Sequence, residues 1–182
     1  MSLLAVKSLS LTLGQPLFTD LSFTVAPGDR IGLVAANGRG KSSLLRLLAG
    51  GIAPTAGDVT RARGLKVGHV EQDVAGALLA LTLRAAVLAA LPADEADYEG
   101  WRVDVTLDAL SVPERFRDVA LGSLSGGWQR TALLARAAVG EPDLYLLDEP
   151  TNHLDLGRIA RLAGWMADLP RAVAVIAASH DR

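Results

Sequence analysis

Residues 31–49 read IGLVAANGRGKSSLLRLLA, and this stretch decides the fold. The apolar run at 31–36 predicts a short strand, and the leucines within 42–49 predict a buried helix. A glycine-rich loop therefore connects a strand to the start of a helix. In this context backbone N–H groups can wrap phosphate groups.

The loop also has side chains suited to a nucleoside triphosphate. Gly38 and Gly40 permit unusual backbone angles, and the Lys41 ammonium can reach the terminal phosphates. The Ser42 hydroxyl can hold Mg²⁺. Taken alone, the loop has a second interpretation, a glycine-rich turn that only starts a helix.

One position departs from the phosphate-loop pattern G-x-x-x-x-G-K-[ST]. The pattern requires a glycine five residues before Gly40, where this chain has Ala35. If that position needs a positive φ, alanine costs about 1–2 kcal/mol there. We then expect ATP binding that is weakened roughly tenfold but not abolished.

A second apolar run, 144–147, ends in two carboxylates, Asp148 and Glu149. Parallel sheets place ligands at the C-terminal ends of their strands. Asp148 is suited to hold Mg²⁺, and Glu149 can polarise the water that attacks a γ-phosphate. Capping of the following helix is the alternative role, and the presence of a phosphate loop favours the catalytic one.

The rest of the chain predicts an α/β protein with a mainly parallel, helix-covered sheet. Antiparallel strands are expected at 3–13 and 17–25, because turns at 14–16 and 27–29 follow apolar–polar alternation. Further elements are a strand pair within 57–71, helical patterns at 74–91 and 101–119 interrupted by an acidic stretch at 94–99, helices at 125–139 and 155–168, and a strand at 172–178.

Composition restricts the functional classes. The 182 residues suit one domain, and a net charge of −2 argues against nonspecific nucleic-acid binding. With no cysteine, disulfides and thiolate metal sites are excluded, so cytoplasmic localisation is the default. Arg84 interrupts the most membrane-like window, 74–93, which predicts no direct membrane insertion.

The sequence resembles the ATP-binding cassette (ABC) family, whose motifs occur here in the expected order. The matching segments are 37–43, Gln72, Leu124-Ser125-Gly126-Gly127-Trp128-Gln129, Asp148-Glu149-Pro150, Asn152-His153-Leu154-Asp155 and Ser179-His180-Asp181. The resemblance implies an α/β P-loop NTPase fold of the ABC type, with an N-terminal antiparallel β part and a helical subdomain at about 73–139. We expect one ABC domain over 1–182 that is truncated at its C-terminus.

The resemblance also implies a role for each motif, with ATP and Mg²⁺ as cofactors. Capping of a helix is an equal alternative for Asp155, and a neutral structural role is the alternative for His180. The implied ATP-binding residues are Asn37, Gly38, Arg39, Gly40, Lys41, Ser42 and Ser43. The implied catalytic residues are Glu149, His180 and Gln72, and the implied metal ligands are Ser42, Gln72 and Asp148. Ser125, Gly126 and Gly127 are expected to contact the nucleotide of a second ABC domain, and Asp155 is expected at that dimer interface.

The sequences of residues 149–155 and 179–182 most resemble those of the F subfamily of soluble, translation-associated ABC proteins. This resemblance implies a ribosome partner. A basic arm is not expected, because the region 94–99 is acidic. Leu13 stands where the family commonly has an aromatic residue against adenine, while Phe18 and Phe23 fit the core better. Two alternatives remain, the ATP-binding subunit of a membrane transporter with its permease, and a non-catalytic nucleotide-binding regulatory module.

Overall fold

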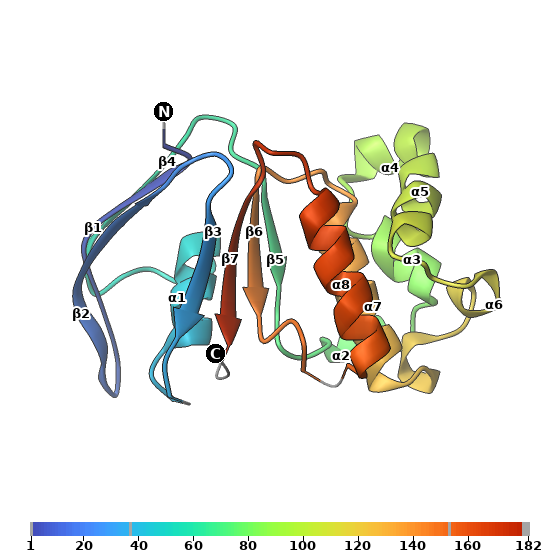
Figure 1. The fold of residues 1–182 in the computed structure, drawn as a ribbon, viewed down its shortest axis with the longest axis horizontal. Coiled ribbons are helices and arrows are strands. Elements are labelled where there is room, and N and C mark those ends of the chain that lie inside the picture. Colours follow the sequence, from blue (N-terminus) through green and yellow to red (C-terminus); the bar gives the residue numbers. More distant parts are fainter. Residues whose placement is uncertain (1, 37, 153, 180–182) are drawn as a thin grey trace. The chain divides into compact units, whose positions relative to one another are not determined.

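The computed structural model describes residues 2–36, 38–152 and 154–179. The chain divides into two compact units (Figure 1). The first comprises Met1–Gln72, Pro142–Pro150 and Pro170–Arg182, and the second comprises Asp73–Glu141 and Thr151–Leu169. The motif calls at Asn37, His153 and His180, together with Asp181 and Arg182, lie outside the described residues.

A three-stranded antiparallel sheet begins the first unit. Its strands are β1 (Leu4–Leu13), β2 (Gln15–Val25) and β4 (Ala56–Arg61), in the order β2-β1-β4. The two N-terminal strands therefore form the antiparallel pair that the sequence predicts.

The second sheet of this unit is entirely parallel. It contains β3 (Arg30–Val34), β5 (Val67–Val70), β6 (Leu144–Asp148) and β7 (Ala174–Ser179), in the order β3-β7-β6-β5. Every residue of β6 is buried, and the apolar run at 144–147 accounts for the burial of all but Asp148. The fold is the predicted α/β P-loop architecture, with its ligand-facing strand ends on one side of the sheet.

Helix α1 (Lys41–Ala49) packs into the same core through its leucines. Its C-terminal end is held by Arg61, whose guanidinium donates hydrogen bonds to the carbonyls of Leu47 and Leu48 at 3.1 and 3.0 Å. A cation at this end satisfies carbonyls that have no partner within the helix. Strand β4 thereby fixes the helix that follows the phosphate loop.

The prediction of a strand pair within 57–71 was wrong in its pairing. β4 pairs with β1 in the antiparallel sheet, whereas β5 pairs with β6 in the parallel one. The residues of β4 alternate between exposed and half-buried, as in a sheet with one solvent-exposed face. The residues of β5 are all half-buried or buried, as in a sheet that is covered on both faces. The two segments therefore belong to different sheets.

The second unit is helical. Its elements are α2 (Gly76–Leu79), α3 (Leu83–Leu88), α4 (Ala93–Glu99), α5 (Trp101–Ala109), α6 (Glu114–Arg117), the 3-10 turn η1 (Leu121–Ser123), α7 (Gly126–Ala138) and α8 (Leu156–Asp168). The apolar residues of α3, α5 and α7 form its core. Thr82 begins α3 by accepting a hydrogen bond from the Ala85 N–H, which divides the pattern predicted as one helical stretch at 74–91.

The acidic stretch 94–99 was expected to interrupt the helices, and it forms α4 instead. Pro92 precedes the helix, and Asp94 and Glu95 occupy its first turn. Carboxylates are favoured at that end by the helix dipole, so the charges start a helix here.

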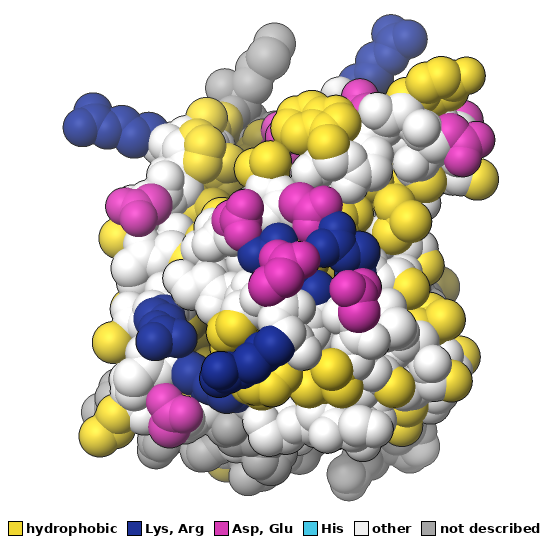
Figure 2. Space-filling view, turned by 90° about the vertical axis from the view of Figure 1, so that its right-hand side faces the viewer, with side chains coloured by type: hydrophobic (Ala, Val, Ile, Leu, Met, Phe, Trp, Pro, Cys, Tyr) yellow, Lys and Arg dark blue, Asp and Glu magenta, His cyan; other side chains and the backbone are white. Residues whose placement is uncertain are grey.

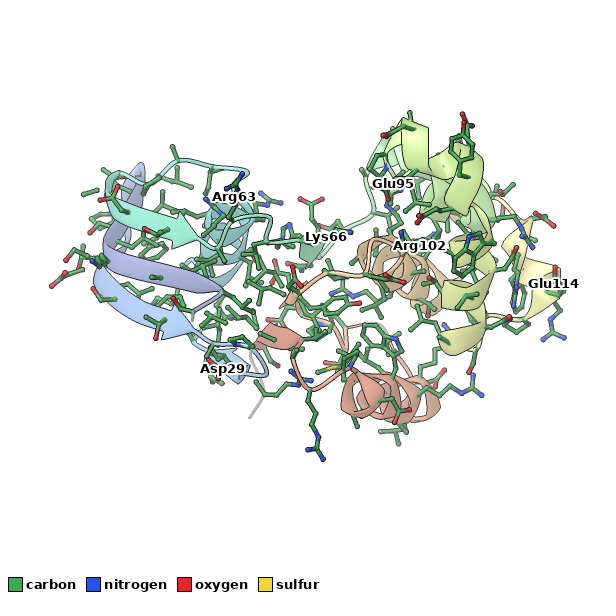
Figure 3. The ribbon with its side chains drawn as sticks, turned by 90° about the horizontal axis from the view of Figure 1, so that it is seen from above. Asp29, Arg63, Lys66, Glu95, Arg102 and Glu114 are labelled. Carbon is green, nitrogen blue, oxygen red and sulfur yellow. The ribbon has the colours of Figure 1, made fainter. Side chains whose placement is uncertain are left out.

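Buried arginines cross-link these helices. Arg117 donates hydrogen bonds to Asp104 at 3.3 Å, to Asp108 and to the Val112 carbonyl at 3.0 Å. The hydrogen bond to Asp108 raises the pKa of Arg117 above its ordinary value. Arg102, also buried, lies 3.6 Å from Glu95 (Figure 3).

Acidic and basic side chains gather next to one another on the face shown in Figure 2. Arg84 also contacts carboxylates of the helical unit, since its guanidinium contacts Asp104 and lies 3.2 Å from Glu114.

Among the described residues, no helix has the length and apolar character needed to span a bilayer.

Candidate functional site

The phosphate loop connects the end of β3 to the start of α1, as its sequence predicts. Gly38 and Gly40 have φ angles of +76° and +83°. No side chain caps α1 at Gly40, so the first N–H groups of the helix can serve an anion. A Cβ added to Gly40 would lie 3.0 Å from the Leu17 Cβ, so tight packing also disfavours a larger residue there.

Lys41 joins the loop to the end of β6. Its ammonium donates a hydrogen bond to the Ala35 carbonyl at 2.7 Å and lies 3.8 Å from Glu149 Oε1. The side chains of Lys41 and Glu149 are both 9% exposed. The fold therefore brings the predicted phosphate-binding cation and the predicted catalytic carboxylate together in a shielded position.

Glu149 has an unusual backbone. Its φ of 49° lies in the left-handed region that non-glycine residues rarely adopt. Its N–H donates to the Ala178 carbonyl at 3.0 Å, which fixes the turn to the end of β7. The turn directs the chain out of the sheet immediately after the buried Asp148.

Oxygen donors suited to Mg²⁺ lie in this unit. Asp148 is 3% exposed at the end of β6, Ser42 lies in the first turn of α1, and Gln72 follows β5. Among the described residues, no three His, Cys, Asp or Glu side chains form a metal-binding group. Mg²⁺ is usually held by one or two protein oxygens together with phosphates and water.

Ala35 does not have the backbone conformation on which its predicted cost depended. Of the described non-glycine residues, only Ser8, Asp20, Ser111, Glu141 and Glu149 have positive φ. The expected strain at Ala35 is therefore absent. The group that accepts the hydrogen bond from Lys41 is the backbone carbonyl of residue 35, which every residue type has. The structure gives no backbone reason for weakened ATP binding.

His69, on β5, is a titratable group that the sequence did not single out. Burial lowers its pKa below the ordinary 6.5, an effect that the charges of Glu71 and Asp148 oppose. Its Nε2 is buried and has no hydrogen-bond partner among the described residues. A neutral imidazole is the form that this position favours.

The segment Ser125-Gly126-Gly127 lies in the second unit, at the start of α7. Ser125 is the N-cap residue, but its hydroxyl accepts no capping hydrogen bond. Ser125 and Gly126 are exposed, whereas Gly127 is buried. Asp155 does cap α8, since its carboxylate accepts a hydrogen bond from the Arg158 N–H at 2.9 Å.

Comparison with known proteins agrees with these features. A family model described as ABC transporter matches residues 18–152, well over half of the chain. The chain is an ABC ATPase domain. Members of this family hydrolyse ATP and use it together with Mg²⁺.

Two groups of named relatives are similar to this ABC domain. The zinc import ATP-binding protein ZnuC of Cereibacter sphaeroides is 38% identical over all of this chain and 74% of its own length. The probable ATP-binding protein YheS of Escherichia coli is 36% identical over 99% of this chain. This ABC domain spans only 28% of YheS.

Solved structures share the fold. A metal-chelate type ABC transporter in an inward-facing conformation has a TM-score of 0.85 at 28% identity, over all of this chain and 74% of that one. A dimeric bacterial ABC transporter cassette has a TM-score of 0.83 at 22% identity, over 98% of this chain and 88% of that one.

Two sequence observations near the site have a clear outcome in this ABC domain. Leu13 is 57% exposed at the end of β1. Phe18 and Phe23 pack against the core, as the sequence suggested.

Sequence reasoning gave no role to Arg158, whose side chain covers Gly127. Its position three residues after Asp155 was the available signal.

Proposed function

We propose that this ABC domain binds Mg-ATP through its phosphate loop and hydrolyses it in a composite site completed by a second ABC domain. The observation that carries this proposal is the shielded contact between Lys41 and Glu149. An ammonium and a carboxylate held close together beside an anion-binding helix start are the charges that phosphoryl transfer requires.

In this mechanism the two residues have different roles. The Lys41 ammonium turns to the terminal phosphates and exchanges its present contacts for stronger negative charge. Glu149, released from that cation, orients the attacking water and accepts its proton. Ser42, Asp148 and Gln72 would hold Mg²⁺, which supplies positive charge at the reacting phosphates.

The remaining motif residues complete the site across the pair. Ser125, Gly126 and Gly127 of one domain contact the terminal phosphate bound by the other, and Asp155 lies at the interface. His180 contacts the γ-phosphate, Gln72 senses the metal and the water, and the other loop residues bind phosphate: Asn37, Gly38, Arg39, Gly40 and Ser43. We propose that both units form one ABC domain, with 73–139 as its helical subdomain.

We further propose a nucleotide-driven switch of the F-subfamily kind, acting in the cytoplasm with the ribosome as partner. The sequence of residues 149–155 and the similarity to YheS support this role. The ATP-binding subunit of a transporter is the second candidate, because ZnuC is similar along the whole chain. Pull-down of the full-length protein separates the two roles, since the first predicts ribosomes and the second a membrane permease.

The Glu149→Gln variant tests the chemistry. We expect phosphate release to fall roughly 10²- to 10⁴-fold, because the general base is lost. ATP binding persists, and the bound pair accumulates as a dimer in size-exclusion chromatography. Glu114→Gln, at an exposed carboxylate of the second unit, is the matched control. Undiminished release in Glu149→Gln contradicts the role, and no release from the parent chain supports the non-catalytic module.

A further inference from the structure

Arg158, in the first turn of α8, lies across the start of α7. Its guanidinium carbon is 4.2 Å from the centre of the Trp128 ring. Its Nε is 3.5 Å from Asp155 Oδ2, and its side chain is 20% exposed. Each of these residues belongs to the second unit.

Gly127 provides the space for this arrangement. A Cβ added to Gly127 would lie 1.8 Å from Arg158 Nη1 and 2.9 Å from its Cζ. No other side chain at position 127 is compatible with the present place of the guanidinium. The glycine therefore permits a close approach, which is a role separate from backbone flexibility.

Helix α7 does not itself attract the Arg158 guanidinium. The N-terminal turn of α7 carries the positive end of the helix dipole, which disfavours a cation. The Trp128 ring and the Asp155 carboxylate offset this repulsion. Trp128 is in turn fixed by Phe116, whose ring centre is 5.0 Å away. Specific partners thus hold the guanidinium against the helix start.

We propose that Arg158 is a positioning residue that sets the conformation of Ser125-Gly126-Gly127 and ties it to the segment ending at Asp155. The proposal rests on the proposed function, in which those three residues meet the nucleotide of the opposing domain. Arg158 joins Asp155, the predicted interface residue, to Trp128 and Gly127 in one contact chain. Its loss frees the start of α7 and leaves the phosphate loop untouched.

A thiol probe tests the positioning without any need for catalysis. The chain has no cysteine, so Ser125→Cys introduces a single reactive group. In that background we expect Arg158→Ala to raise the rate of maleimide modification roughly two- to fivefold, which corresponds to the loss of a cation–π contact. Arg158→Lys keeps the charge but loses the planar stacking, so its modification rate should lie between those of the parent and Arg158→Ala. Arg161→Ala, at an exposed position of the same helix, leaves the rate unchanged.

An unchanged modification rate in both Arg158 variants overturns the proposal. The Lys variant retains a test if the Ala variant does not fold. Without the thiol, we expect Arg158→Ala to lower kcat for phosphate release roughly tenfold, because misplaced groups slow a preorganised reaction. The Kd of a labelled ATP analogue stays unchanged, and a parallel loss of ATP binding contradicts a role limited to positioning. If the parent chain releases no phosphate, the proposed function fails while the thiol rates still decide this inference.

Discussion

The two units use buried charge in opposite ways. In the first, the shielded pair of Lys41 and Glu149 has both members 9% exposed, and both belong to the predicted reaction. In the second, buried Arg102 and Arg117 each contact several carboxylates that are themselves partly exposed. One unit therefore holds a contact that the proposed mechanism requires nucleotide to break, while the other holds contacts that fix helices together.

This difference shows why an ion pair alone does not identify a site. The buried Arg117 compensates its burial with several acceptors, as a structural role requires. Among the described residues, Lys41 instead contacts the Ala35 carbonyl and the Glu149 carboxylate, at a helix start that no side chain caps. All three tryptophans, Trp101, Trp128 and Trp165, belong to the second unit, so their fluorescence monitors it directly.

The largest expected effect is catalytic and lies in the first unit. Lys41→Gln keeps a donor for the Ala35 carbonyl but removes the charge, so phosphate release should fall roughly 10²- to 10³-fold. The free energy of unfolding should fall by about 3 kcal/mol, because the shielded Glu149 carboxylate loses its cation. Phosphate-release and urea-unfolding measurements check both values. Arg46→Gln, in the exposed pair with Glu71, is the control, and equal losses of release in both variants would contradict the comparison.

The next effect concerns stability and lies in the second unit. Arg117→Met removes the hydrogen bonds to Asp104, Asp108 and Val112, which should cost about 2–3 kcal/mol. The denaturation midpoint followed by tryptophan fluorescence measures this loss. Arg115→Met, at the exposed neighbour that stacks on Phe116, should cost about 1 kcal/mol or less. Similar denaturation midpoints for Arg117→Met and Arg115→Met would contradict a structural role for the buried Arg117 contacts.

A smaller effect depends on pH. The pKa of His69 lies below its ordinary value of 6.5, so below that pH the unfolded chain binds the proton more readily than the folded one. The parent therefore loses stability as pH falls below about 6.5, by at most about 1.4 kcal/mol per pH unit, until the folded pKa is passed. His69→Gln should flatten this dependence, as measured by hydrogen exchange in β5 and β6.

Glu71→Gln provides an internal check of the same group. The Glu71 charge favours the protonated imidazole, so its removal lowers the pKa of His69 further. Acid destabilisation then extends to lower pH before it levels off. A shift in the opposite direction would show that another group controls the titration.

The smallest expected effect is at Ala35. Because its φ is not left-handed, Ala35→Gly relieves no backbone strain. ATP affinity should stay within about twofold of the parent, a change below about 0.5 kcal/mol. Titration of a labelled ATP analogue measures it. A tenfold gain would show that nucleotide binding requires a backbone angle absent from this structure.

Local sequence predicted the elements whose patterns are strong. The unbroken apolar runs at β3 and β6 and the leucines of α1 predicted the parallel sheet, its helix and the carboxylates at the strand end. Pairing at 56–70 was not predictable from alternation, because partners far away in sequence decide which sheet a strand joins. The acidic helix α4 was missed because charge at a helix start stabilises it without an apolar pattern.

The candidate site divides in the same way. The phosphate loop and the Asp148-Glu149 pair were evident from residue order, and the structure adds the proximity of Lys41 to Glu149. The stacking of Arg158 on Trp128 was not evident, because it joins two helices whose spacing no local pattern encodes. Side-chain partners on different elements were therefore evident only from the structure.

The left-handed backbone at Glu149 has a consequence for how this domain can be stabilised. Such a conformation costs a non-glycine residue about 1 kcal/mol or more, and Glu149→Gly would relieve it. The same change would delete the carboxylate that the proposed chemistry uses. Directed evolution for thermal tolerance alone would thus favour an inactive domain at this position, and only a screen that also demands turnover would retain the acid.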